Sequence, residues 1–313
     1  MNIAGSVLAP AGAPALVIAQ MSWVMFVGAA LIFAAVMALL AWAVGRRREG
    51  DAERRIDART WILGGGLAFP AVVLVALFVY ARFGAAAGAP AASADPMVVS
   101  VIGRDWWWDL RYRDPATGRE IVLANEIHVP AGRSVVFGLN SGDVIHSFWV
   151  PALAGKVDMI PGRVQQLRIE VPQPGRHRGQ CAEFCGEQHA GMAFEVVVDP
   201  PPVFEAWLQA QAAPAARPSG AVATRGLALF VSEGCAACHS IRGLAEEANA
   251  GPDLTHVASR RFIGAGTLPA DEAGFARWIA GVQHLKPGAR MPQYGRLDPS
   301  ALAALATFLG QLR

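Results

Sequence analysis

The sequence predicts a membrane-spanning α-helical hairpin, followed by an all-β domain and then by an all-α domain. Two long apolar segments lie near the N-terminus. Many short β-prone runs separated by turn residues come next, and the last third of the chain has apolar residues at helical spacing. A length of 313 residues is enough for about two globular domains behind such a hairpin.

The hairpin is expected over residues 22–83. Its two apolar segments, 22–44 and 61–83, each have roughly the 20 apolar residues that a membrane helix needs. They account for a hydrophobic fraction of 53%, which is high for a water-soluble protein. Arginine in a short loop marks the cytoplasmic side, and the connection contains Arg46, Arg47, Arg48, Arg54, Arg55 and Arg59. Both termini and everything after the hairpin are therefore expected on the periplasmic face of a bacterial inner membrane.

A cleaved signal peptide is the alternative interpretation of the first apolar segment. Signal peptides carry positive charge ahead of their apolar core. Here residues 1–45 contain no charged side chain, and the arginines follow the apolar segment. This order favours a retained helix behind an N-terminal tail of residues 1–21, and the sequence leaves open whether that tail is trimmed.

A linker of Ala, Gly, Pro and Ser at 84–96 leads into the all-β domain, expected over 97–200. Short strands at close spacing indicate a small sandwich or barrel. The β-prone runs are 97–103, 106–113, 134–140, 144–150, 166–171 and 192–198.

The all-α domain is expected over 223–313, behind a second linker at 201–222 that contains only a brief amphipathic turn near Phe204 and Trp207. Apolar residues recur at helical spacing in this last part of the chain. Asp298 followed by Pro299 is typical of a helix start, with an N-cap and proline at the first helical position.

The first motif is a group of soft metal ligands between residues 181 and 192: Cys181, Cys185, His189 and Met192. Thiolate, imidazole and thioether together suit copper better than magnesium or calcium. A further histidine is expected from elsewhere in the chain, with His128, His146 and His177 as candidates, and His146 is expected at the end of a strand. In an exported protein a Cys181–Cys185 disulfide is the alternative, but it would not explain the other ligands.

The second motif is Cys235-Ala-Ala-Cys238-His239, the haem-attachment spacing of c-type cytochromes. The two cysteines would bind haem covalently, and His239 would be one axial ligand. Met291 is the single methionine after His239, which makes it the expected second axial ligand unless His256 or His284 takes that place. A thioredoxin-type or accidental pair is the alternative, and the following Gly-Pro loop at 251–252 favours haem.

Taken together, these residues resemble subunit II of the haem-copper cytochrome c oxidases, and specifically the caa-type, which has a cytochrome c domain fused behind the copper domain. The hairpin and the runs 101–108, 146–148 and 160–163 also carry this resemblance. It implies a cupredoxin-like sandwich for 97–200 and a class I cytochrome c fold for 223–313.

The resemblance also implies residue roles. The binuclear copper centre, CuA, would be bridged by both cysteines and completed by two histidines, a methionine and a backbone carbonyl: Cys181, Cys185, His146, His189, Met192 and Glu183. The Glu183 side chain would point to a magnesium site shared with subunit I. Trp106 would be the exposed ring through which electrons reach copper, its alternative being core packing, which is expected for Trp108. His128 and His177 are expected to be ordinary surface or packing residues.

The implied function is that of the subunit through which electrons enter a terminal respiratory oxidase. A soluble cytochrome or upstream complex would reduce covalent haem c, and electrons would pass through CuA to subunit I, where oxygen is reduced to water with proton pumping. No oxygen-reducing site is expected in this chain.

A CuA-type nitric oxide reductase and a free-standing membrane-anchored electron carrier are the alternatives to this function. A proton-path role for Asp57 is not carried over, because its spacing to Pro70 departs from the family. A net charge of +2 without a basic patch argues against nucleic acid as a partner.

Overall fold

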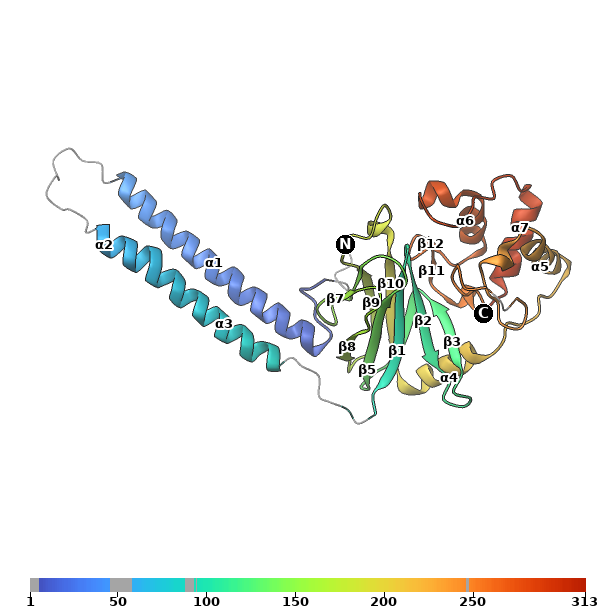
Figure 1. Cartoon of the computed structure of the whole chain (residues 1–313), viewed down its shortest axis with the longest axis horizontal. Coiled ribbons are helices and arrows are strands. Elements are labelled where there is room, and N and C mark those ends of the chain that lie inside the picture. The colour runs from blue at the N-terminus through green and yellow to red at the C-terminus, as the bar shows by residue number, and fades with distance from the viewer. Residues whose placement is uncertain (1–5, 46–57, 88–92, 94, 246–247) are drawn as a thin grey trace. The chain divides into compact units, whose positions relative to one another are not determined.

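The computed structural model describes residues 6–45, 58–87, 93, 95–245 and 248–313 (Figure 1). The chain divides into two compact units. One is the helical hairpin, 13–89, and the other contains residues 1–12 and 90–313. We describe each unit by itself.

The hairpin unit has two helices long and apolar enough to cross a membrane, Ala13–Gly45 and Ala58–Gly84. The first, α1, begins at Ala13 rather than near residue 22, because the apolar, charge-free sequence continues upstream. The second begins as α2 (Ala58–Thr60) and continues as η2 (Trp61–Ala68) and α3 (Phe69–Ala87). Asp57 and the loop arginines other than Arg59 lie outside the described residues.

The second membrane helix contains a wide, π-helical segment, η2, where Gly64, Gly65 and Gly66 occur. At its end the Phe69 N–H donates to the Gly64 carbonyl, five residues back. Pro70 follows directly and has no N–H to offer the preceding turn. A local departure from α geometry is a known way for a membrane helix to accommodate such residues.

The β domain is a sandwich of two five-stranded sheets (Figure 1). The first has the order β3-β2-β1-β5-β8, with bounds Glu120–Ala124, Trp107–Arg113, Met97–Arg104, Ser134–Ser141 and Gln165–Glu170. The second has the order β4-β10-β9-β6-β7, with bounds Glu126–Pro130, Ala193–Asp199, Gly175–Cys181, His146–Trp149 and Val157–Met159. Both sheets mix parallel and antiparallel neighbours: β1 pairs with β5 and β4 with β10 in parallel.

Inward-facing side chains of both sheets form one hydrophobic core. Trp108, Phe137 and Phe148 are among its fully buried members. Trp108 has the packing role expected for it, since its ring lies edge-on to Phe148 with centroids 5.8 Å apart.

Helix α4 (Pro201–Ala212) extends this core, since Phe204 and Leu208 are buried in it. The sequence had predicted only a brief turn within a linker here. The two apolar residues lie four positions apart, and burying them against the sandwich requires a full helix.

The described residues of the C-terminal domain form three α-helices, α5 (Ala221–Ser232), α6 (Glu272–Leu285) and α7 (Pro299–Gly310), two short 3-10 helices, η4 (Cys235–Ala237) and η5 (Val257–Ser259), and a small hairpin of β11 (Phe262–Ile263) and β12 (Leu268–Pro269). Its core is separate from that of the sandwich and includes Phe230, Phe275 and Phe308. Asp298 caps α7 as predicted, because its carboxylate accepts from the Ser300 and Ala301 backbone N–H groups at 2.8 and 2.9 Å.

Residues 213–220, expected to be a flexible linker, are hydrogen-bonded along their length to the C-terminal domain. The Ala215 N–H donates to the Arg242 carbonyl at 2.8 Å, and the Ser219 N–H donates to the Gln311 side chain at 2.9 Å. Composition alone gave no sign of these contacts, because both partners are distant in sequence.

Candidate copper and haem centres

Six candidate copper ligands come together at one end of the sandwich. His146 begins β6, Cys181 ends β9, and the remaining residues lie in the connection from β9 to β10. The two ends of that connection are joined, because the Cys181 N–H donates to the Met192 carbonyl at 2.9 Å. The Ala182 N–H donates to the Ser147 carbonyl at 3.0 Å and so ties the loop to the strand that carries His146.

The ligand atoms themselves are within contact distance of one another. Cys181 Sγ lies 3.9 Å from His146 Nδ1 and 3.2 Å from the Glu183 carbonyl oxygen. Cys185 Sγ lies 3.7 Å from His189 Nδ1 and 3.9 Å from Met192 Sδ. Each sulfur therefore has its own histidine and one further weak donor.

The two thiols face each other without forming a disulfide. Cys181 Sγ and Cys185 Sγ are 3.8 Å apart, whereas a disulfide bond measures about 2.05 Å. The hydrogen bond from Cys185 is the largest cause that lowers the pKa of Cys181, and the same contact with burial raises the pKa of Cys185. The pair therefore shares one proton, which a bound cation would replace.

His146 is held in one orientation from both sides. Its Nε2 lies 2.7 Å from the Asp143 carboxylate, which leaves Nδ1 directed at Cys181. A Cβ at Gly103 would lie 2.7 Å from the ring, so only glycine leaves room there. Burial alone would lower the pKa of His146, but Asp143 and Cys181 raise it to about 9. Carboxylate orientation of a ligating imidazole is common in metal sites.

Trp106 directly contacts the connection from β9 to β10, residues 182–192, which we call the copper loop. Its indole Nε1–H donates to the Cys185 carbonyl at 2.7 Å. The ring also lies against Gly186, where a Cβ would come within 3.1 Å of it. The neighbouring Trp107 lies instead beneath the Arg104 guanidinium, 5.7 Å from its ring centroid.

A cavity of about 650 Å³ lies between the sandwich and the C-terminal domain. Ligand pockets usually have volumes of about 300–1,000 Å³. The C-terminal domain contributes Cys235, Cys238, His239 and Met291 to the lining, and the sandwich contributes Trp106 and Trp107. The residues of the Cys-x-x-Cys-His motif and the lone methionine therefore face one space, as covalent haem requires.

His239 is oriented by the loop that the sequence singled out. Its Nδ1 donates to the Pro252 carbonyl at 2.8 Å, which leaves Nε2 available to a metal. A Cβ at Gly251 would lie 2.7 Å from the ring. Burial lowers the pKa of His239, which favours the neutral imidazole that binds iron.

Met291 is better placed than the two alternative axial ligands. His256 is buried with its ring nitrogens 2.9 and 3.0 Å from the carbonyl oxygens of Arg313 and Ala213. His284 is exposed on α6. Neither is among the described residues that line the cavity.

Two contacts in this region were not predicted from the sequence. Gln283 Nε2 donates to the Ala289 and Met291 carbonyls at 2.7 and 2.8 Å and so holds the methionine loop. Lys286, at the end of α6, donates to backbone carbonyls of both domains. Neither residue belongs to a short motif, so no local signal marks them.

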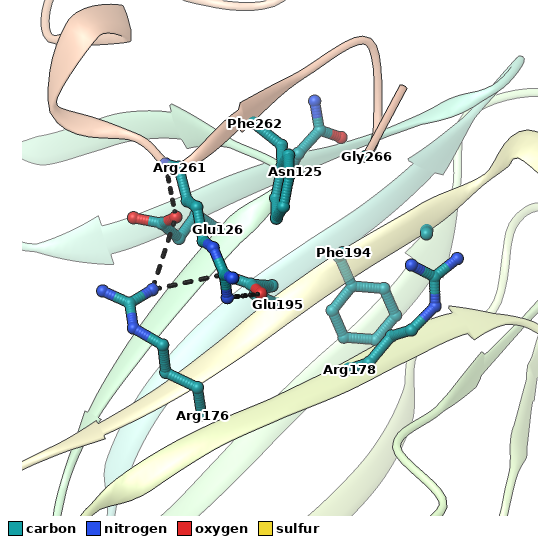
Figure 2. A pocket seen from close by; sticks show the side chains of 10 residues that line it. Asn125, Glu126, Arg176, Arg178, Phe194, Glu195, Arg261, Phe262 and Gly266 are labelled. Carbon is teal, nitrogen blue, oxygen red and sulfur yellow. Dashed lines mark hydrogen bonds and ion pairs between the residues drawn. The ribbon is translucent and has the colours of Figure 1, made fainter. Parts of the chain in front are cut away.

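A second cavity, of about 400 Å³, lies at the same domain boundary and contains a network of charges (Figure 2). Arg261 donates to Glu195 through Nη1 at 3.0 Å and to Glu126 through its backbone N–H at 2.9 Å. Arg176 pairs with Glu195 at 3.2 Å. The Arg261 contacts cross from the C-terminal domain to the sandwich, whereas the Arg176–Glu195 pair lies within the sandwich.

His128 and His177 lie apart from the copper ligands. His128 is buried between Asp199, 2.6 Å from Nδ1, and Glu126, 3.1 Å from Nε2. His177 lies on β9 with both ring nitrogens buried and unpaired among the described residues, and burial lowers its pKa.

Comparison with known proteins gives two family matches. The family model of the cytochrome c oxidase subunit II periplasmic domain matches residues 114–199, and the cytochrome c model matches 223–313. Cytochrome c oxidase subunit 2 of Alkalihalophilus pseudofirmus is 31% identical over 275 residues, which cover 86% of this chain and 78% of that protein. This chain belongs to the cytochrome c oxidase subunit 2 family.

Two further relatives and one solved structure are also similar to this chain. Cytochrome c oxidase subunit 2 of Bacillus sp. PS3 is 32% identical, over 69% of this chain and 62% of that protein. Cytochrome c oxidase subunit 2 of Bacillus subtilis is 29% identical, over 70% of this chain and 63% of that protein. The periplasmic domain of subunit II of cytochrome oxidase from Bradyrhizobium japonicum is 29% identical, covers 39% of this chain and 96% of that chain, and has a TM-score of 0.36.

Family membership confirms the predicted fold class: two apolar helices, a cupredoxin-like sandwich and a helical cytochrome c domain. The protein is membrane-anchored with a periplasmic domain and forms part of an oxidoreductase complex. The two domain families imply copper and haem, and the converging soft ligands and the cysteine-lined cavity fit these groups.

Proposed function

We propose that this chain is the subunit through which electrons enter a terminal respiratory oxidase. When bound, a covalent haem c and a binuclear CuA centre supply the one-electron chemistry by which electrons from a soluble cytochrome or upstream complex reach subunit I, where oxygen is reduced to water with proton pumping. The chain's own residues hold these groups, orient them and set the path between them.

The residue assignments follow the two clusters. We assign Cys181 and Cys185 as bridging copper ligands, completed by the two histidines, the methionine and the carbonyl: His146, His189, Met192 and Glu183. For haem we assign the thioethers to Cys235 and Cys238 and the axial positions to His239 and Met291. The Glu183 carboxylate, which pairs with Lys156 at 3.1 Å, is the proposed ligand for magnesium at the boundary with subunit I.

One observation carries the proposal: Trp106 contacts residues of both candidate sites. Its side chain lines the cavity that contains the haem motif, and its Nε1–H donates to the carbonyl of Cys185. A single indole and one hydrogen bond therefore connect the haem cavity to a copper ligand. This contact supports Trp106 as the electron path and argues against a packing role alone.

The domain limits and membrane placement form part of the proposal. A hairpin through the bacterial inner membrane would precede a copper domain over 97–200 and a cytochrome c domain over 223–313. Both domains and both termini would lie on the periplasmic side. Arg59 is the described member of the arginine loop expected on the cytoplasmic side.

The experiment is to replace Trp106 with Gln in the full-length subunit within its complex. We expect two coppers and one covalent haem per chain, as in the parent, with transfer from haem to copper slowed severalfold because the indole bridge is gone. Flash reduction of haem measures transfer, and metal analysis measures content. Normal transfer with intact copper would refute the role of Trp106.

Co-purification tests the enzyme assignment. A partner subunit that consumes oxygen is expected. Nitric oxide turnover without oxygen uptake would identify a nitric oxide reductase, and the absence of any partner subunit would identify a free-standing carrier.

A further inference from the structure

Lys286 is a buried cation at the boundary between the two domains. It follows the last residue of α6, and only 4% of its surface is exposed. Its ammonium group donates three hydrogen bonds, to the carbonyls of Trp106 at 2.8 Å, Gly191 at 2.9 Å and Gly264 at 3.1 Å. Two of these acceptors belong to the sandwich and one to the C-terminal domain.

The three acceptors match the chemistry of lysine. An ammonium group has three N–H donors that radiate from one nitrogen, so three carbonyls satisfy it fully, whereas the planar fork of arginine does not fit such a set. The chain has 25 arginines and only two lysines, Lys156 and Lys286. A lysine at this buried three-carbonyl position is therefore a specific choice in a chain that mostly uses arginine.

The sandwich acceptors are the backbone of the proposed electron path. Trp106 carries the indole that bonds to Cys185, and Gly191 directly precedes Met192 in the copper loop. We propose that Lys286 is a positioning residue that docks the cytochrome c domain against the copper loop and holds Trp106 between the two centres. The electron-transfer part of this inference rests on the function proposed above.

The exposed ion pairs across this boundary are weaker candidates for the same role. The side chains of Arg261 and Arg290 pair with Glu195 and Asp105 at 3.0 and 3.2 Å, but 55% and 73% of these arginine side chains are exposed. Exposed ion pairs contribute little to stability. A buried ammonium with three acceptors contributes more, because its loss leaves the Trp106 and Gly191 carbonyls without this charged donor, while the Gly264 carbonyl still accepts from Thr267 Oγ1 at 2.6 Å.

The test compares Lys286→Met with Arg261→Met in the full-length holoprotein within its complex. Both substitutions remove one positive charge from the same boundary and leave the same side chain, but only the first removes the buried donor. Hydrogen exchange at 262–269 and 189–193 measures docking, and flash reduction of haem measures transfer to copper. Metal analysis and visible spectra report both centres.

For Lys286→Met we expect exchange protection of these segments to fall roughly tenfold or more, the factor that matches loss of a charged hydrogen-bond donor. Transfer should slow in parallel, with copper and haem content and spectra unchanged. Arg261→Met should stay within about twofold of the parent in both measurements.

Unchanged hydrogen-exchange protection and unchanged electron transfer in Lys286→Met would overturn the inference. Loss of copper from this variant would also overturn it, because Lys286 would then only support the copper loop. If Lys286→Met does not accumulate, Lys286→Arg gives the same test, since it keeps the charge but not the donor geometry. Hydrogen exchange needs no electron transfer. If the parent itself transfers no electron from haem to copper, the proposed function fails while the docking measurement still stands.

Discussion

At the scale of single residues, the two centres share one design: a histidine is oriented by an oxygen acceptor on one ring nitrogen, and a glycine makes room for its ring. Asp143 and Gly103 do this for His146, while Pro252 and Gly251 do it for His239. The acceptor is charged at the copper site and neutral at the haem site. The negative charge of the carboxylate makes the His146 imidazole more basic as a metal ligand than the neutral carbonyl makes the His239 imidazole.

His128 gives a prediction at this scale, because it forms a buried ion pair with Asp199 and Glu126. Burial alone would lower the pKa of His128, but the two carboxylates outweigh burial and raise it. Because the pKa of His128 is higher in the folded than in the unfolded protein, protonated His128 stabilises the fold. This stabilisation is complete at pH values below the unfolded-state pKa of about 6.5, and it is lost as the pH rises through the folded-state pKa. The melting temperature of the parent protein should therefore decrease as the pH rises from about 6.5 through the folded-state pKa of His128.

His128→Gln should remove that alkaline decline in thermal unfolding of the full chain. The same change should also weaken the decline on the acid side, because burial raises the pKa of Glu126 and the His128 hydrogen bond is the largest cause that lowers it, which adds stability that is lost as pH falls. An equal alkaline decline in the parent and in His128→Gln would contradict the assignment.

At the scale of elements, the sequence predicted strands β1, β2, β5, β6, β8 and β10 of the sandwich and did not predict β3, β4, β7 and β9. β9 reads Gly-Arg-His-Arg-Gly-Gln-Cys and has no apolar alternation, yet it forms a central strand because β10 and β6 pair with it on either side. β3 and β4 are separated by Asn125 alone, whose left-handed backbone (φ 63°) turns the chain between the two sheets. Long-range pairing decides such elements, and local propensity does not.

Helix α6 carries a prediction at this scale, because its Gln283 holds the loop that contains Met291. Gln283→Leu leaves two carbonyls without their donor, at a cost of about 1–3 kcal/mol for each that stays buried. We expect weaker binding of Met291 to haem iron, and therefore a lower haem potential, since methionine ligation raises it. Covalent attachment through Cys235 and Cys238 should be unaffected.

Redox titration of the full chain measures the effect of Gln283→Leu. The matched control is Gln293→Leu, which makes the same substitution at an exposed position of the same loop and should leave the potential unchanged. Equal shifts in both variants would show that the loop responds to any change of polarity.

At the scale of the whole molecule, the site residues that the sequence revealed are those close together in the chain. Five of the six proposed copper ligands lie within twelve residues and three of the haem residues within five. Lys286 was not predicted, because its sandwich contacts are 180 and 95 residues away. Local motifs thus identify ligands, whereas residues that connect two domains become visible only once both cores have formed.

The two ligand sets belong to different hydrophobic cores, and this predicts independent assembly of the centres. Cys181, Cys185 and Met192 are buried in the sandwich core, whereas Cys235 and Met291 pack against the core of the C-terminal domain. Replacing both Cys235 and Cys238 with Ser should abolish covalent haem and leave two coppers bound. Cys185→Ser should do the opposite, since it removes one of the two thiolates proposed to bridge the coppers.

Metal analysis and haem staining of the purified full-length variants measure both outcomes. Lys286 contacts both domains. If copper binding required the two domains to be docked, a change in the cytochrome c domain would therefore also reduce the copper content. Loss of copper from the haem-free variant would show that the sandwich needs the cytochrome c domain to form its metal site. Retention of copper would show that the copper site forms without covalent haem in the other domain, as two separate hydrophobic cores predict.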